Sequence, residues 1–251
     1  MKPVIFAFVI ALLLIVPVVI PKSVNHVPSK DLTNLQLTLP DGTIIERYVH
    51  VFYKKDFARE SARRPGGGSE CFAYISKNTK WRTTEGFVLD PSNGDGLSEL
   101  FVADAVEKSF NAWNDQAVFN LFGSRDVSKT VDGLDKTSPD GKNEVMFGSI
   151  DSSGAIAVTY VWRVYISPTQ KEIIEFDALF DDEFLWGDAT INPNLMDLQN
   201  IATHEFGHAA GMGHPNNGCT EETMYAYASE SETKKRTLNA GDIKGIKALY
   251  G

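Results

Sequence analysis

Apolar and polar residues alternate in two runs near the amino terminus, and apolar residues recur at helical spacing further along the chain. Residues 36–53 alternate on both sides of Pro40-Asp41-Gly42, which predicts a strand, a turn and a second strand. Ser98 is a good N-cap for a helix that runs to about Gln116, because apolar residues follow it at intervals of three or four. These residues are Leu100, Ala103, Val106, Phe110 and Trp113, and further strands are predicted at 85–89, 118–122, 144–147, 155–165 and 172–180.

This order of elements predicts an α+β domain. A strand, a long helix and then several strands favour a twisted mixed sheet of about five strands with helices packed on it. Asn192 and Pro193 provide a cap and a first-turn proline for the next helix. With 251 residues and 43% hydrophobic content, the chain is long enough for one sizeable domain with a core.

The predicted helix after Pro193 leads into residues 204–214, His-Glu-Phe-Gly-His-Ala-Ala-Gly-Met-Gly-His. His204 and His208 are four residues apart, so on a helix they project from the same face, one turn above the other. Two imidazoles placed in this way can bind one zinc ion. Glu205, next to the first ligand, can reach a water molecule on that metal.

The residues after His208 predict a chain reversal that supplies a third metal ligand. Gly211 falls where the helix has to stop, since only Gly enters the left-handed conformation without steric cost. A turn there can bring His214 back to the same metal. Three protein ligands leave the fourth position for water, which is typical of a catalytic rather than a structural zinc site.

The amino-terminal residues predict export and a division into three parts. Met1-Lys2 precedes an apolar run over residues 4–20, which indicates a segment that directs export. A cleaved signal peptide and a retained membrane anchor both fit residues 1–21, because the run is near the lower limit for crossing a bilayer. Residues 22–70 form an amino-terminal segment that contains the flexible linker 63–69. A spacer with no regulatory role is the simpler interpretation, and a pro-segment released by proteolysis at the linker is the alternative. Residues 71–251 form the main domain.

The charge of the chain argues against one class of partner. The formal net charge is −9, and the longest basic run has three residues, Lys234, Lys235 and Arg236. Sequence-independent binding to nucleic acid is therefore not expected. We expect a monomer that is secreted or held at the cell surface.

Two cysteines, Cys71 and Cys219, suit an exported chain. The simpler interpretation is one disulfide that joins the start of the main domain to the segment after His214. An alternative is that Cys71 is an inhibitory thiolate at the open zinc position. Free thiols are a third interpretation.

The histidine pattern with a methionine shortly after it resembles the metzincin zinc endopeptidases. Met224 is similar in position to their Met-turn, whose side chain forms a floor under the metal. Tyr225 directly after it resembles the matrixin, or matrix metalloproteinase, family, although Ala226 replaces the family's Pro and Tyr227 comes one position early. The last helix, 238–251, and the segments 80–81 and 176–186 also resemble matrixins.

The resemblance implies further features. The strand 155–161 would pair with an extended substrate, and Tyr225 and Tyr227 would line a substrate pocket. One zinc is expected instead of a matrixin's two, since the sequence has no histidine between His50 and His204. Calcium at Asp177, Asp181 or Asp182 is compatible with the resemblance, and so is a solvated acidic loop. The family's cysteine-containing inhibitory motif is absent around Cys71, and Pro215 replaces the usual Ser.

Together these features predict a zinc-dependent endopeptidase that cleaves extracellular polypeptides. Zinc would activate a water molecule, and Glu205 would act as general base. Two alternatives remain: a catalytically silent zinc-binding adhesion or scaffold protein of the same fold, and a zinc enzyme that acts on other substrates. The retained Glu205 argues against a silent protein.

Overall fold

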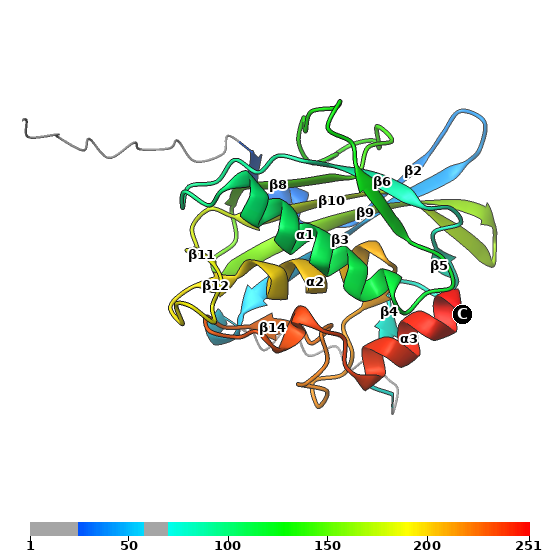
Figure 1. Cartoon of the computed structure of the whole chain (residues 1–251). Coiled ribbons are helices and arrows are strands. Elements are labelled where there is room, and N and C mark those ends of the chain that lie inside the picture. The colour runs from blue at the N-terminus through cyan, green and yellow to red at the C-terminus, as the bar shows by residue number, and fades with distance from the viewer. Residues whose placement is uncertain (1–24, 58–69) are drawn as a thin grey trace, which may run out of the picture.

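The structure is a computed structural model that describes residues 25–57 and 70–251 (Figure 1). The predicted export segment, 1–21, and the linker, 63–69, lie outside these residues. Among the described residues, no helix combines the length and the apolar character needed to cross a bilayer.

One mixed sheet runs through the molecule in the order β14-β3-β9-β10-β8-β6-β7. Strands β10, β8, β6 and β7 run parallel to one another, while β9 is antiparallel to both of its neighbours, β10 and β3. The bounds are β3 (Ile44–Lys54), β6 (Glu85–Leu89), β7 (Phe122–Arg125), β8 (Glu144–Ile150), β9 (Ala155–Ser167), β10 (Gln170–Asp181) and β14 (Tyr227–Ala228).

Shorter elements complete the sheet and the loops around it. Strands β1 (His26–Val27), β2 (Leu35–Thr38) and β5 (Thr79–Lys80) pair with β8, β3 and β10. Two-stranded pairs are formed by β11 (Trp186–Gly187) with β12 (Met196–Asp197), and by β13 (Met212–Gly213) with β4 (Ala73–Tyr74). Single 3₁₀ turns are η1 (Ser29–Asp31), η2 (Lys55–Phe57) and η4 (Lys234–Arg236).

Three α-helices accompany the sheet in the described parts of the chain: α1 (Glu99–Asn114), α2 (Leu198–Ala209) and α3 (Ala240–Tyr250). Figure 1 shows α1 and α2 side by side across one face of the sheet, with α3 near the carboxyl terminus. The indole nitrogen of Trp113 donates to the carbonyl oxygen of Thr203 at 2.8 Å, and Phe110 stacks on Phe206 with ring centroids 3.9 Å apart. These contacts fix α2, the helix of the predicted zinc motif, against α1.

The predicted α+β fold, a mixed sheet with helices packed on it, is confirmed. Strands β6 to β10 supply the expected five strands, and α1 begins after Ser98, whose hydroxyl accepts from the amide of Phe101 at 3.2 Å. The sheet is larger than expected because residues 25–57 add β1, β2 and β3 to it. Val27 in β1 is fully buried, so this segment is packed into the fold.

Two local predictions were wrong. The helix α2 does not begin at Asn192: it begins at Leu198, because the side chain of Asp197 caps it by accepting from the amide of Asn200 at 2.9 Å. The Asn192 side chain closes a local turn by accepting from the amide of Asn194. The strand predicted at 118–122 is displaced to β7, which starts at Phe122.

Candidate metal centre

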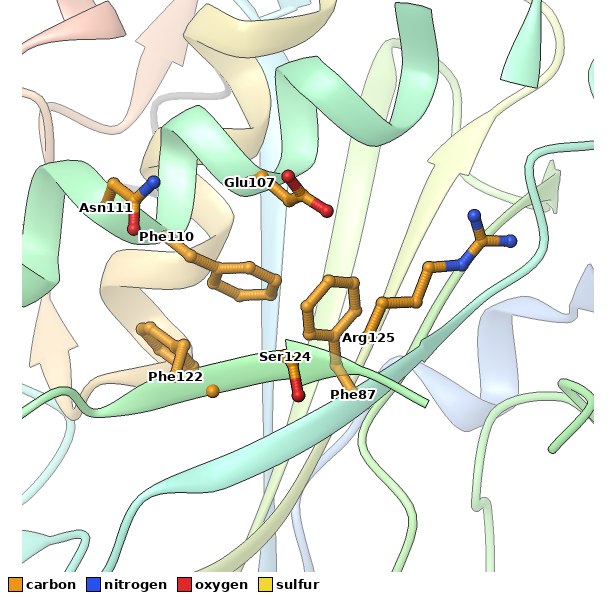
Figure 2. A pocket seen from close by; sticks show the side chains of 8 residues that line it. Phe87, Glu107, Phe110, Asn111, Phe122, Ser124 and Arg125 are labelled. Carbon is orange, nitrogen blue, oxygen red and sulfur yellow. The ribbon is translucent and has the colours of Figure 1, made fainter. Parts of the chain in front are cut away.

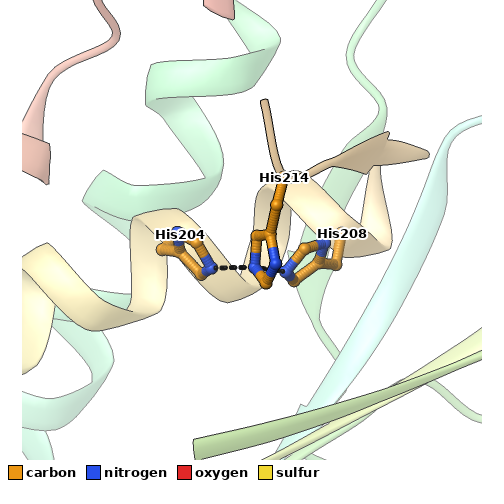
Figure 3. A group of neighbouring side chains, drawn as sticks. All are labelled: His204, His208 and His214. Carbon is orange, nitrogen blue, oxygen red and sulfur yellow. Dashed lines mark hydrogen bonds between the residues drawn. The ribbon is translucent and has the colours of Figure 1, made fainter. Parts of the chain in front are cut away.

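Helix α2 and the turn after it bring His204, His208 and His214 together (Figure 3). The helix ends at Ala209, and Gly211 has a φ of +95°, a left-handed conformation that reverses the chain. A Cβ atom at Gly211 would lie 2.8 Å from the carbonyl oxygen of Thr79, so the position has no room for a side chain. The reversal leads through β13 to His214.

The three imidazoles converge through their Nε2 atoms. Nε2 of His214 lies 3.1 Å from that of His204 and 3.0 Å from that of His208. The Nδ1 atoms of His204 and His208 lie 2.7 and 2.9 Å from the carbonyl oxygens of Thr223 and Met212. A carbonyl oxygen only accepts, so these Nδ1 atoms carry the protons and both Nε2 atoms present lone pairs.

A cation bound by the Nε2 atoms would resolve this arrangement, because His214 can donate a proton to only one of two neighbouring lone pairs. Burial lowers the pKa of His204 and His208 well below the usual value, and it lowers the pKa of His214 to about 4. The imidazoles are therefore neutral at pH 7, the form that binds a metal. Three neutral imidazoles suit zinc.

Glu205 lies beside this centre and is completely buried. The hydroxyl of Thr159, on β9, donates to its Oε2 at 2.5 Å, and Oε1 has no hydrogen-bond partner among the described residues. Burial raises the pKa of Glu205 to about 8, and the hydrogen bond from Thr159 opposes that shift. Thr159 could not be identified from the sequence, because β9 is far from the zinc motif along the chain.

Met224 packs directly against the helix that carries the histidines. A Cβ atom at Gly207 would overlap the Met224 sulfur, so the two residues meet only because Gly207 has no side chain. The turn that holds Met224 is fixed from α3, since the Asp242 carboxylate accepts from the amides of Thr223 and Met224 at 2.6 and 3.2 Å. Asp242 thereby positions the Thr223 carbonyl that binds His204.

The two predicted pocket tyrosines follow Met224 at the edge of the sheet. Tyr227 is in β14, which pairs with β3 in parallel register, Tyr227 opposite Tyr53. The ring of Tyr225 lies 5.6 Å from that of Tyr227. The buried ammonium of Lys235 donates to the Tyr227 carbonyl oxygen at 3.0 Å and so helps to hold β14 in place.

The edge of β9 that was predicted to receive a substrate is covered in this structure by β3. The pairing of the two strands extends from Ile45 opposite Val164 to Tyr53 opposite Ala155. The ring of His50 stacks on His208 with centroids 3.9 Å apart, and the ring of Phe52 stacks on His204 at 3.7 Å. The sequence pattern placed β3 in a separate amino-terminal segment and contained no sign of this position.

A second cluster of metal-ligating groups consists of Asp135, Glu175 and Asp177. Glu175 and Asp177 are buried, and Oε1 of Glu175 and Oδ2 of Asp135 have no hydrogen-bond partner within the described parts of the chain. Burial, together with the neighbouring carboxylates, raises the pKa of Glu175 to about 10 and that of Asp177 well above its usual value. The predicted residue Asp177 belongs to this cluster, whereas Asp181 and Asp182 do not.

A pocket of about 240 Å³ lies between α1 and strands β6 and β7 (Figure 2). Phe110 lines it and packs on Phe206 of α2. Residues two apart on a helix point in nearly opposite directions, so Phe206 and His204 face opposite sides of α2. The pocket is therefore separated from the metal centre by the helix itself.

Comparison with known proteins decides the family. The family model described as matrixin, a peptidase family, matches residues 80–251. The chain belongs to the matrixin family. This matrixin is 40% identical over 209 residues to metalloendoproteinase 1-MMP of Arabidopsis thaliana, covering 81% of the chain and 51% of that relative. It is 27% identical over 187 residues to neutrophil collagenase of Homo sapiens, covering 72% of the chain and 35% of the relative.

The matrixin spans at most about half the length of these curated relatives. Its two cysteines form a disulfide between Cys71 and Cys219, with Cα atoms 5.4 Å apart. A disulfide suits a protein outside the cytoplasm. It also means that Cys71 is not a thiolate in this structure, so the alternative in which Cys71 blocks the metal does not apply to it.

Proposed function

We propose that this matrixin is a zinc-dependent endopeptidase that hydrolyses internal bonds of extracellular polypeptides, with residues 71–251 as its catalytic domain. The observation that carries the proposal is the convergence of three neutral imidazoles beside a buried carboxylate with one uncommitted oxygen. A purely structural site has no need of such a carboxylate. The alternative of a silent zinc-binding scaffold therefore leaves Glu205 unexplained.

The residues of the chain divide the chemistry among them. A zinc ion held by His204, His208 and His214 would supply a Lewis acid that polarises a carbonyl group and lowers the pKa of water. Glu205 takes a proton from the attacking water through Oε1 and then passes it to the leaving amine. Thr159 holds Oε2 and so keeps the carboxylate in one orientation.

The substrate would bind as an extended strand. With β3 displaced, the edge of β9 would offer main-chain groups for β-augmentation next to the metal centre, and Tyr225 and Tyr227 would line the pocket beyond the cleaved bond. The disulfide, the predicted export segment and the family support a protein that acts outside the cell, either secreted or attached to a membrane by residues 1–21. A monomer is part of the same proposal.

Cleavage of casein by the full chain tests the proposal. The chain would be compared with a variant carrying His50→Ala and Phe52→Ala, in which the rings over the metal centre are shortened. We expect the variant to hydrolyse casein faster than the wild type, in a reaction that a zinc chelator abolishes and added zinc restores. If both proteins bind one zinc per chain and neither cleaves casein nor a mixed peptide library, the silent scaffold becomes the better explanation.

We further propose that Asp135, Glu175 and Asp177 bind calcium. Carboxylate oxygens are the ligands that this cation prefers, and two oxygens of the cluster lack other partners in the described residues. Without a cation, the raised pKa of Glu175, about 10, means that folding favours its protonated form, so its cost to stability grows as the pH rises above 4.5. Calcium is therefore expected to raise the melting temperature at pH 8 much more than at pH 5.

The variant Glu175→Gln provides the control for calcium. Its melting temperature at pH 8 without calcium should exceed that of the wild type, because Gln is already neutral whereas Glu175 must take up a proton on folding, and its response to calcium should be lost. A wild-type chain whose melting temperature is unchanged by millimolar calcium at pH 8 would show that the cluster is not a calcium site.

A further inference from the structure

Strand β3 lies in the place that the proposed function gives to a substrate. It is antiparallel to β9 on one side and parallel to β14 on the other, so it fills the gap between the strand edge and the segment after Met224 (Figure 1). His50 lies opposite Thr159, the residue that binds Glu205. An extended peptide cannot pair with β9 while β3 occupies this edge.

The side chains of β3 also close the metal centre. His50 and Phe52 point to the same face of the strand, as residues two apart do, and their rings stack on His208 and His204. His204, His208 and Glu205 are 0% exposed. A general base without solvent access cannot reach a substrate, so the described arrangement is a closed one.

We propose that β3 is an internal cover that excludes substrates and other ligands from the metal centre, and that its release opens the cleft. The proposal rests on the proposed function for what the open cleft does. It differs from inhibition by a cysteine thiolate, because Cys71 is held in the disulfide and the residues over the metal are His50 and Phe52.

Contacts away from the metal hold the cover in place. Glu46 pairs with the buried guanidinium of Arg163, whose Nε lies 2.8 Å from the Glu46 carboxylate. At the other end of the strand, the Lys54 ammonium lies 2.6 Å from the Glu230 carboxylate. Arg47 lies over the Tyr160 ring, 4.4 Å from its centroid. The cover is thus bound along its whole length, and a full chain would be largely latent.

The opposite face of β3 offers a way to lock the strand without touching the centre. Val51 lies opposite Val158, and both pack in the apolar cluster on the far side of the sheet. The amide of Val49 donates to the Asn34 side chain and therefore points away from β9. Main-chain groups of alternate residues in a strand point the same way, so Val49 and Val51 both occupy non-hydrogen-bonded positions in the pairing with β9. Side chains are closest at such positions, which suits a disulfide.

The test compares three forms of the full chain: wild type, Val51→Cys with Val158→Cys, and His50→Ala with Phe52→Ala. Two readouts are measured on zinc-loaded protein, the rate at which pyridine-2,6-dicarboxylate withdraws zinc and the rate of cleavage of a quenched fluorescent peptide. We expect oxidation of the form with Val51→Cys and Val158→Cys, which locks β3 to β9, to lower both rates at least about tenfold, and we expect mild reductant to restore them. Wild type treated with the same reductant controls for the Cys71–Cys219 bond. The alanine variant should raise both rates.

The two readouts separate the two proposals. If zinc withdrawal responds to the lock and to the alanine variant while none of the proteins cleaves any peptide, the cover stands and the peptidase proposal fails. If the locked protein is folded, by its melting temperature, and loses zinc and cleaves peptide as fast as its reduced form, β3 does not cover the centre. The alanine variant decides the question if the lock prevents folding: unchanged rates of both kinds in that variant overturn the proposal.

Discussion

Replacing Glu205 with Gln is expected to lower kcat by about 10²- to 10⁴-fold while zinc remains bound at one ion per chain. Glu205 follows the ligand His204 in α2, and its buried Oε1 has no hydrogen-bond partner among the described residues, so this oxygen is free to take a proton. Gln keeps the size and the hydrogen bond from Thr159 but cannot accept the proton. The measurement is peptide cleavage in the variant that carries His50→Ala and Phe52→Ala, together with zinc analysis.

Thr159→Val is the matched comparison for Glu205→Gln. It removes the hydroxyl that donates to Oε2 and leaves the carboxylate in place. A positioning role predicts a smaller loss of kcat than for Glu205→Gln. It also predicts that the pH profile of kcat shifts to higher pH, because the hydrogen bond from Thr159 holds the pKa of Glu205 down. If Glu205→Gln retained more than a tenth of the activity, Glu205 would not be the general base.

The sequence could predict the metal centre because its parts are local. Three histidines and Glu205 lie within eleven residues, and one helix with one left-handed glycine is enough to bring them together. The strands β6, β8, β9 and β10 were predictable for a similar reason, since each shows its own apolar pattern. The start of α2 was misplaced because Asn192 and Asp197 are both good caps, and only the folded chain shows which one satisfies helical amides.

The cover over the centre could not be predicted in this way. The pattern of residues 44–54 predicts a strand, but the partner of a strand depends on pairing over more than 100 residues, for which the sequence carries no local signal. Thr159 and Asp242 were missed for the same reason: each acts on the zinc motif from a distant element. The sequence therefore predicts the residues of the metal centre, whereas the strand that covers the centre and the distant residues that hold its parts in place are found only in the structure.

The disulfide carries the second large expected effect. The variant Cys71→Ser with Cys219→Ser is expected to lose about 4–5 kcal/mol of unfolding free energy, because the bond closes a loop with a sequence separation of 148 residues and loop-closure entropy grows with loop length. In a chain of this size that loss lowers the melting temperature by about 10–20 °C. Calorimetry and urea unfolding of the zinc-loaded protein measure both quantities.

The disulfide should also influence the metal centre. Cys219 lies between His214 and Thr223, whose carbonyl oxygen fixes the Nδ1 proton of His204, so freeing this segment loosens one of the three ligands. Zinc affinity of the double variant is therefore expected to fall, and reductant should produce the same change in the wild type but none in the variant. A stability loss below about 1 kcal/mol would mean instead that other contacts hold the segment in place, foremost the hydrogen bonds that the Glu222 carboxylate accepts from the amides of Gly241 and Asp242. The disulfide would then serve export or protease resistance more than the architecture of the zinc site.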